Sequence, residues 1–153
     1  MLFRSPYSII QDKEAHGDVI IWPLKALCDY VEETGDFAVL AEAVPWRRED
    51  NFERTAAADP VASHVGKLIA TVCRRFIPGT HLISYGNGDW NDSLKPVDPA
   101  KREWMVSSWT VALLYEQLRR YAAILRRSGR SDGSAEERLA AAIRDDFNRF
   151  LDP

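Results

Sequence analysis

Apolar residues recur at helical spacing along most of the chain. Over residues 18–33 they fall at i, i+4, i+7 and i+11, which places four of them on one helix face: Ile20, Leu24, Leu27 and Val31. Gly35 suits the left-handed conformation that ends a helix, and Asp36 suits the cap of a short following helix that stops at Pro45. The pattern therefore predicts a long helix followed directly by a short one.

Three further helices are predicted downstream. Asp59-Pro60 and Asp98-Pro99 each open one, with Asp as the cap and Pro at the first helical position, where its missing N–H is harmless. The first ends at Pro78-Gly79. The second runs to about Ser128 and is apolar over most of its circumference, which is typical of a helix buried between neighbours. Ser134-Ala135-Glu136-Glu137 predicts a capping box for the last helix, whose apolar face carries Leu139, Ile143, Phe147 and Phe150.

One stretch between the second and third long helices has no periodicity. Residues 81–85 predict a short extended piece. Residues 86–94, Gly-Asn-Gly-Asp-Trp-Asn-Asp-Ser-Leu, combine glycines with acidic, amide and aromatic side chains. The chain shows neither an internal repeat nor a low-complexity linker. It is therefore predicted to be one all-α domain of paired helices with a single irregular loop.

Composition and charge exclude several classes of protein. The 153 residues are 46% hydrophobic and carry a net charge of −3, which fits one folded domain and gives no field to attract nucleic acid. The basic cluster near the end of the third long helix is expected to be compensated by acidic residues of the last helix; the two sets are Arg119, Arg120, Arg126, Arg127, Arg130 and Glu136, Glu137, Asp145, Asp146. No apolar run approaches the ~20 residues of a membrane-spanning helix, so no membrane partner is expected.

The cysteines and histidines give no metal or redox signature. Cys28 and Cys73 lack the spacing of zinc ligands, and the first residues lack a secretory signal, so both thiols are predicted to be buried in a cytoplasmic protein. His64 lies among apolar positions of a helix and is predicted to be a hydrogen-bonded core histidine. His16 is interpreted as a helix-start or site residue. We expect no metal and no cofactor.

The irregular loop carries the candidate chemistry. Asp89, Trp90, Asn91 and Asp92 bring two carboxylates, an amide and an indole together. An indole face stacks on the C–H face of a sugar ring, and carboxylate and amide groups match its hydroxyls. A carboxylic acid with a raised pKa can protonate a glycosidic oxygen. These residues indicate a carbohydrate site. The alternative is that the polar side chains only form turns and caps, with Trp90 in the core.

The loop also carries a family resemblance. Residues 88–94 resemble the Gly-Asp-Trp-Asn-Asp motif of glycoside hydrolase family 94, which comprises inverting cellobiose, chitobiose and β-1,2-oligoglucan phosphorylases and the related domain of cyclic β-1,2-glucan synthases. Residues 17–36 are similar to the family's Asp…Trp…Pro-Leu helix that ends in Thr-Gly-Asp, and residues 109–115 to the helix after its catalytic loop. The resemblance spans about residues 16–128, and residues 93–96 look like the oligoglucan branch.

The resemblance implies a fold, a reaction and residue roles. The fold is the (α/α)6 barrel of six-hairpin glycosidases. Asp92 is implied to be the general acid, Trp90 to line the sugar site, and Asp89 and Asn91 to shape the loop or bind hydroxyls. The implied enzyme is a hexosyltransferase that converts a β-linked gluco-oligosaccharide and inorganic phosphate, its co-substrate, into a sugar 1-phosphate with inversion. An inverting hydrolase, which needs a second carboxylate about 6.5–9.5 Å from the acid, stays open as an alternative.

We expect several segments that the family possesses to be absent from this chain. We expect residues 1–153 to be an incomplete (α/α)6 barrel, a partial catalytic domain without the N-terminal β-sandwich, the early barrel helices and the late ones that hold phosphate. Apolar faces meant for missing neighbours would then be exposed and favour association, with a complementing chain or in a homo-oligomer. Alone, the chain is expected to be inactive. A non-catalytic helical module that binds sugar or a partner is the other alternative.

Overall fold

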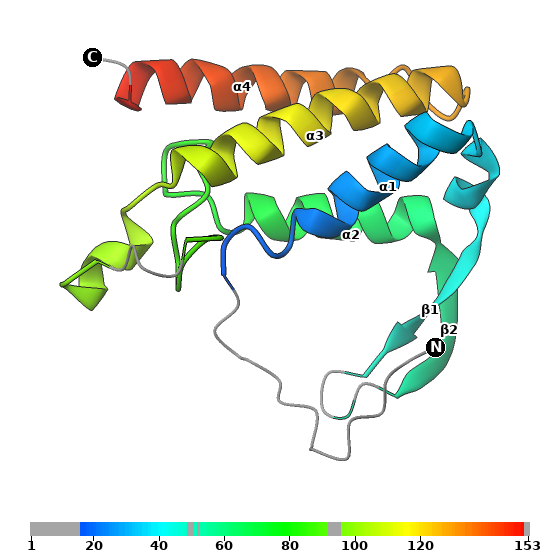
Figure 1. Cartoon of the computed structure of the whole chain (residues 1–153), viewed down its shortest axis with the longest axis horizontal. Coiled ribbons are helices and arrows are strands. Elements are labelled where there is room, and N and C mark those ends of the chain that lie inside the picture. Colours follow the sequence, from blue (N-terminus) through cyan, green and yellow to red (C-terminus); the bar gives the residue numbers. More distant parts are fainter. Residues whose placement is uncertain (1–15, 49–50, 52, 92–95, 152–153) are drawn as a thin grey trace.

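The computed structural model describes residues 16–48, 51, 53–91 and 96–151 of the chain (Figure 1). This part is mostly helical, as expected, but it also contains a two-stranded antiparallel sheet, so the all-α prediction is only partly right. The elements in chain order are α1 (Trp22–Thr34), η1 (Phe37–Ala41), β1 (Ala43–Arg47), β2 (Arg54–Pro60), α2 (Val61–Cys73), η2 (Pro99–Glu103), α3 (Ser108–Arg127) and α4 (Ser134–Leu151).

The first helix ends as predicted but begins later. Ile21 and the residues before it form turns, and α1 starts at Trp22. At the other end Gly35 adopts a φ of 69° and donates its N–H to the Val31 carbonyl. Asp36 then accepts hydrogen bonds from the Ala38 N–H at 3.0 Å and from the Tyr30 hydroxyl at 2.8 Å. This arrangement gives the Thr-Gly-Asp sequence a structural role in closing α1, and it raises the pKa of Tyr30 through the hydrogen bond to Asp36.

The β-hairpin corrects the prediction for residues 36–45. The capped segment is only the 3-10 helix η1, and Pro45 lies inside β1, opposite Ala58 of β2. A proline is tolerated there because both strands of a two-stranded sheet are edge strands. Asp59 does not cap α2, because its Oδ2 accepts a hydrogen bond from Trp46 Nε1 at 2.6 Å. The helix begins one residue later than predicted, at Val61.

The third long helix is shorter than predicted, because helical structure is interrupted between Trp104 and Ser107. Asp98 does cap a helical turn, but that turn is the separate 3-10 helix η2. The Met105 carbonyl then accepts the Tyr85 N–H at 2.7 Å, and Ser107 accepts from the Thr110 N–H as the true cap of α3. Contacts with the irregular loop therefore replace the helical bonds that the apolar pattern had predicted.

The capping box predicted for the last helix is wrong. Ser134 is the first residue of α4, and its hydroxyl accepts from Arg138. The Glu137 N–H donates to the Gly133 carbonyl at 3.1 Å, and Asp132 accepts from the Ser134 N–H at 2.9 Å. Asp132 and Gly133, which precede Ser134, thus cap this helix.

Helix α3 occupies the middle of the helical layer, between α1 and α4 (Figure 1). The prediction that it is buried on several sides is confirmed. One core cluster packs α3 on α4 and α2 through residues such as Val72, Leu114 and Ile143. A second packs it on α1 and α2 through residues such as Leu24 and Ile124. This packing fixes the position of the first turn of α3, from which the candidate site is built.

The charge compensation expected between α3 and α4 is only partly present. Glu137 lies 3.1 Å from Arg126 and 3.9 Å from Arg119. Arg120 instead turns toward α1, where it contacts Asp29 at 2.7 Å and Glu32 at 2.5 Å. The two acidic residues near the end of α4 pair elsewhere, Asp145 with Arg144 and Asp146 with His81.

Candidate active site

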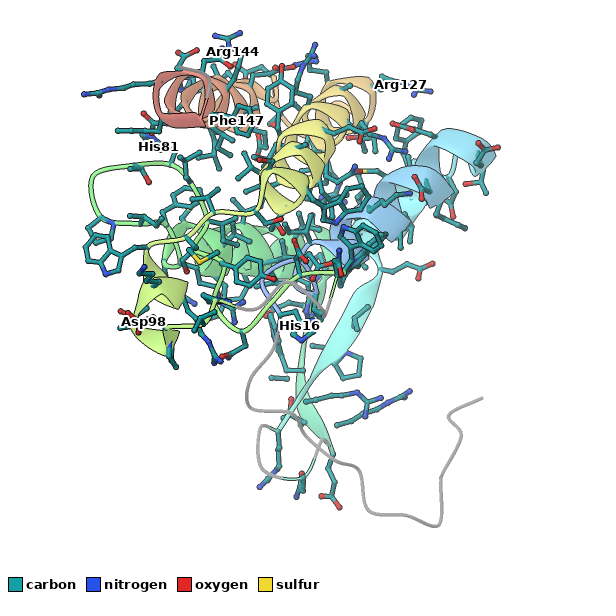
Figure 2. The ribbon with its side chains drawn as sticks, turned by 60° about the vertical axis from the view of Figure 1, so that its left-hand side comes forward. His16, His81, Asp98, Arg127, Arg144 and Phe147 are labelled. Carbon is teal, nitrogen blue, oxygen red and sulfur yellow. The ribbon has the colours of Figure 1, made fainter. Side chains whose placement is uncertain are left out.

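The residues before α1 lie directly against the irregular loop. The Gly17 N–H donates to the Gly88 carbonyl at 2.8 Å, and His16 pairs with Gly86 in an isolated β-bridge. Gly88 has a φ of 141°, and a Cβ at this position would meet the His16 ring at 3.4 Å. His16, labelled in Figure 2, therefore packs against Gly88 of the loop and does not start a helix.

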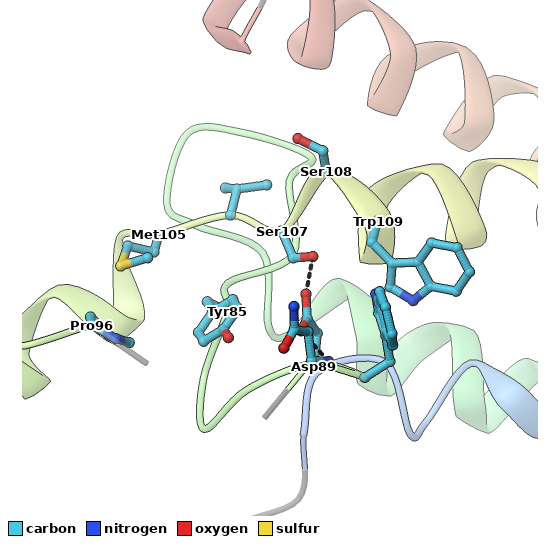
Figure 3. Close-up of a pocket in the computed structure, with 10 residues that line it drawn as sticks. Tyr85, Asp89, Pro96, Met105, Ser107, Ser108 and Trp109 are labelled. Atoms are coloured by element: carbon cyan, nitrogen blue, oxygen red, sulfur yellow. Dashed lines mark hydrogen bonds between the residues drawn. The ribbon is translucent and has the colours of Figure 1, made fainter. Parts of the chain in front are cut away.

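Asp89 holds the loop to the start of α3. It is 5% exposed, its Oδ2 accepts a hydrogen bond from the Ser107 hydroxyl at 2.5 Å, and its Oδ1 accepts from the Asn91 N–H at 2.9 Å (Figure 3). The same Ser107 oxygen accepts the Thr110 N–H at 3.3 Å and so caps α3. Both carboxylate oxygens of Asp89 are therefore bonded within the chain, as expected for a residue that shapes the loop; its binding of sugar hydroxyls stays a prediction.

Trp90 lies at the surface beside a second tryptophan. It is 63% exposed, so the alternative that places it in the core is wrong. Its ring centroid is 5.8 Å from that of Trp109, which is 44% exposed, and the two rings are inclined by 59°. Trp109 comes from the first turn of α3. It has no predicted role in binding, because nothing in the sequence shows that the first turn of α3 meets the loop.

These residues surround a hollow of about 460 Å³ (Figure 3). Its walls combine aromatic and polar side chains, among them Tyr85, Asp89, Trp90, Asn91, Ser108 and Trp109. A volume of this order is typical of small-molecule sites, which are mostly apolar with a few polar groups that orient the ligand. The structure thus brings together three of the four predicted site residues, Asp89, Trp90 and Asn91. The fourth, Asp92, lies outside the described residues; Asn91 and Pro96, on either side of residues 92–95, both line the hollow.

A buried carboxylate near the loop was not singled out from the sequence as a site residue. Asp18 is 2% exposed, and its Oδ2 accepts a hydrogen bond from Trp22 Nε1 at 3.0 Å. Its Oδ1 has no hydrogen-bond partner among the described residues. Because Gly17 is bonded to Gly88, this carboxylate belongs to the segment that supports the loop.

The remaining candidates do not form a second site. His64 is hydrogen-bonded as predicted, to the Val44 carbonyl at 3.0 Å, but it lies half-buried against Trp46 of the hairpin instead of in the core. Cys28 is buried, and Cys73 is only partly buried. The described residues contain no group of three or more His, Cys, Asp or Glu side chains arranged to hold a metal ion. Within the same part of the chain, no helix is long and apolar enough to cross a membrane.

Comparison with known proteins assigns the chain to a family. The catalytic domain of the glycosyl hydrolase 94 superfamily matches residues 6–151. The chain is 40% identical over 145 residues to a 1,2-beta-oligoglucan phosphorylase of Listeria innocua, covering 95% of this chain and 13% of that protein. It is 33% identical over 134 residues to a solabiose phosphorylase of Paenibacillus borealis, covering 87% of this chain and 16% of that protein. It therefore spans less than a fifth of the length of either relative. With nearly all of its length matched, the chain belongs to the glycosyl hydrolase 94 superfamily, within the catalytic domain.

Proposed function

We propose that this chain supplies the acid loop of an inverting glycosyl phosphorylase. The substrate is a β-linked gluco-oligosaccharide, the co-substrate is inorganic phosphate, and the product is a sugar 1-phosphate. The observation that carries the proposal is the position of the loop: Asp89 ties it to α3, and Trp90 and Asn91 line the hollow, immediately before Asp92 in the sequence. Both relatives are named as phosphorylases, which supports phosphorolysis as the reaction.

In the proposed reaction, Asp92 donates its proton to the glycosidic oxygen as the bond from that oxygen to the anomeric carbon breaks. A phosphate oxygen attacks the anomeric carbon from the opposite face, so its electron pair forms the new C–O bond and the configuration inverts. Phosphate is already an anion, so no general base is needed. The reaction requires no cofactor and no metal beyond these groups.

The bonding of Asp89 makes this residue a poor candidate for the base of an inverting hydrolase. An inverting hydrolase activates water with a second carboxylate about 6.5–9.5 Å from the acid. Asp89 is the other aspartate of the loop, but it is buried and its oxygens accept hydrogen bonds from Ser107 and Asn91. A carboxylate held in this way is poorly placed to take a proton from water. Of the two aspartates in the loop, Asp92 is then the one left to exchange a proton with substrate.

We further propose that the helices are part of an (α/α)6 barrel. The placement of α3 between α1 and α4 is consistent with an inter-helix loop that opens at one end of such a barrel. Other barrel segments, from a complementing chain or a second copy, would complete the site, and we expect the isolated chain to turn over little substrate. The two free thiols fit a reducing cytoplasm.

Product analysis of a chimaera tests this proposal. In the Listeria relative, the 145 aligned residues are replaced by those of this chain, and the chimaera is incubated with 1,2-β-oligoglucan. Phosphorolysis predicts sugar 1-phosphate that forms only when inorganic phosphate is present. Release of free sugar at the same rate without phosphate would instead identify a hydrolase. Saturable sugar binding with no product in either condition would identify a binding module.

A further inference from the structure

We infer that Trp109 is a sugar-binding residue, which offers a second indole face beside Trp90 for stacking on a pyranose ring of the oligosaccharide. The inference rests on the proposed function, because it takes an oligosaccharide as the ligand. It adds a residue from α3, outside the loop, and it gives the first turn of this helix a direct part in binding.

The two indoles are unusually exposed for neighbouring tryptophans. Trp90 and Trp109 come from different elements, yet their rings lie 5.8 Å apart and border the same hollow (Figure 3). Tryptophan is highly buried on average, because its large ring is costly to leave in water. At 63% and 44% exposed, these two side chains thus form an apolar surface without a cover among the described residues.

The backbone segments that carry the two indoles are joined by a buried hydrogen bond. Asp89 precedes Trp90 and accepts the hydrogen bond of Ser107, which lies two residues before Trp109. Ser107 also caps α3 through Thr110, which is 2% exposed. The backbone next to each indole is therefore held by the same buried hydrogen bond, between Asp89 and Ser107. A surface that is already ordered loses little conformational entropy when a ligand stacks on it.

The polar surroundings of the pair favour a sugar as the ligand. Asn91 and the exposed Ser108 lie on the wall of the same hollow and carry groups that donate and accept hydrogen bonds. A sugar ring presents C–H groups on its faces and hydroxyls around its edge. Aromatic faces with amide and hydroxyl groups beside them match both.

Calorimetric titration of the 153-residue chain with a 1,2-β-gluco-oligosaccharide, without phosphate, tests the inference. We expect Trp109→Ala to weaken binding about tenfold or more, as loss of a central tryptophan does in many binding sites, and Trp109→Phe to weaken it less. Trp104→Ala is the matched control, because Trp104 is 66% exposed and does not line the hollow. Circular dichroism and thermal unfolding show whether each variant is folded.

The outcomes separate this inference from the proposed reaction. Weak binding by folded Trp109→Ala, together with parent-like binding by Trp104→Ala, supports the inference whether or not phosphorolysis is observed. Equal binding by folded Trp109→Ala and parent would overturn it, as would an equal loss in Trp104→Ala. An absence of binding by the parent chain would also overturn it. A change in oligomeric state with unchanged sugar binding would overturn it in favour of a protein partner.

Discussion

A buried hydrogen bond of 2.5 Å joins Asp89 Oδ2 to the Ser107 hydroxyl, across 18 residues of sequence. One end of the bond holds the loop, and the other caps α3 through the Thr110 N–H. The position of the loop is therefore coupled to the start of the helix that packs between α1 and α4. A change at Ser107 affects both.

Ser107→Ala should lower the free energy of unfolding by about 1–3 kcal/mol. It removes a helix cap and leaves the buried Asp89 carboxylate with one hydrogen bond fewer. Ser107→Thr keeps a hydroxyl and should cost less than half as much. Urea unfolding followed by circular dichroism measures both variants. Equal stability of Ser107→Ala and the parent would show that the bond does not stabilise the fold.

Gly133→Ala should be much more destabilising than Gly129→Ala. Both glycines have a left-handed backbone, with φ of 67° and 69°, so each alanine costs about 1–2 kcal/mol in backbone strain. A Cβ at Gly133 would also lie 2.5 Å from the Ala122 carbonyl oxygen of α3, whereas a Cβ at Gly129 meets nothing within 4 Å. The clash should add about 1–3 kcal/mol. Thermal unfolding of the two variants compares them, and equal melting temperatures would contradict the close approach of Gly133 to α3.

Arg120→Ala should destabilise the chain by about 1–2 kcal/mol, and the neighbouring Arg119→Ala by less than about 0.5 kcal/mol. Arg120 bonds to Asp29 and Glu32 of α1 and to the buried Gln117, and its side chain is only 21% exposed. Arg119 is 58% exposed, with a 3.9 Å contact to Glu137. Chemical unfolding of the matched pair gives both values. A larger loss in Arg119→Ala would contradict the assignment of Arg120 as the link between α1 and α3.

Stability should fall at alkaline pH because of Cys28. Desolvation by burial raises the pKa of its thiol from 9.0 to about 12. The unfolded chain therefore releases this proton above pH 9 while the folded chain keeps it. Stability from the neutral thiol is complete below pH 9 and is lost as pH rises from 9 toward 12, with a slope of at most about 1.4 kcal/mol per pH unit.

The measurement is the free energy of unfolding between pH 8 and pH 10, where Cys28→Ala should flatten the slope and Cys73→Ala should flatten it less. Burial also raises the pKa of Cys73, but this thiol is only partly buried. A thiol reagent at neutral pH should accordingly label Cys73 of the folded chain before Cys28. Faster labelling of Cys28 would contradict its burial.

The sequence predicted helices well where packing and local pattern agree. The face of α1 and the burial of α3 follow from apolar spacing, and the end of α1 follows from the left-handed conformation that Gly35 allows. The predicted helix boundaries were wrong where a contact with a residue distant in the sequence replaces a local hydrogen bond. Asp59 has the sequence context of a helix cap, but its carboxylate accepts a hydrogen bond from Trp46 of the facing strand. The segment around Met105 has a helical pattern, but the Met105 carbonyl accepts a hydrogen bond from the N–H of Tyr85, just before the irregular loop.

The sequence predicted the candidate residues Asp89, Trp90 and Asn91 but not their geometry. Their types support the hypothesis of a sugar site, which stays a prediction. That Asp89 is bonded on both oxygens, and that Trp109 lies beside Trp90, depends on how the start of α3 packs against the loop. No local pattern carries this information, because the two segments are separated along the chain.

The proposed role of Asp92 as proton donor can be tested in the chimaera with the Listeria relative. The rate of sugar 1-phosphate formation from 1,2-β-oligoglucan is determined for the chimaera, its Asp92→Asn variant and its Asp98→Asn variant. Asp98 is the matched control, an exposed aspartate that caps η2 through the Ala100 N–H. We expect a loss of about a hundredfold or more for Asp92→Asn and little change for Asp98→Asn. An Asp92→Asn chimaera that forms sugar 1-phosphate as fast as its parent would show that another group donates the proton.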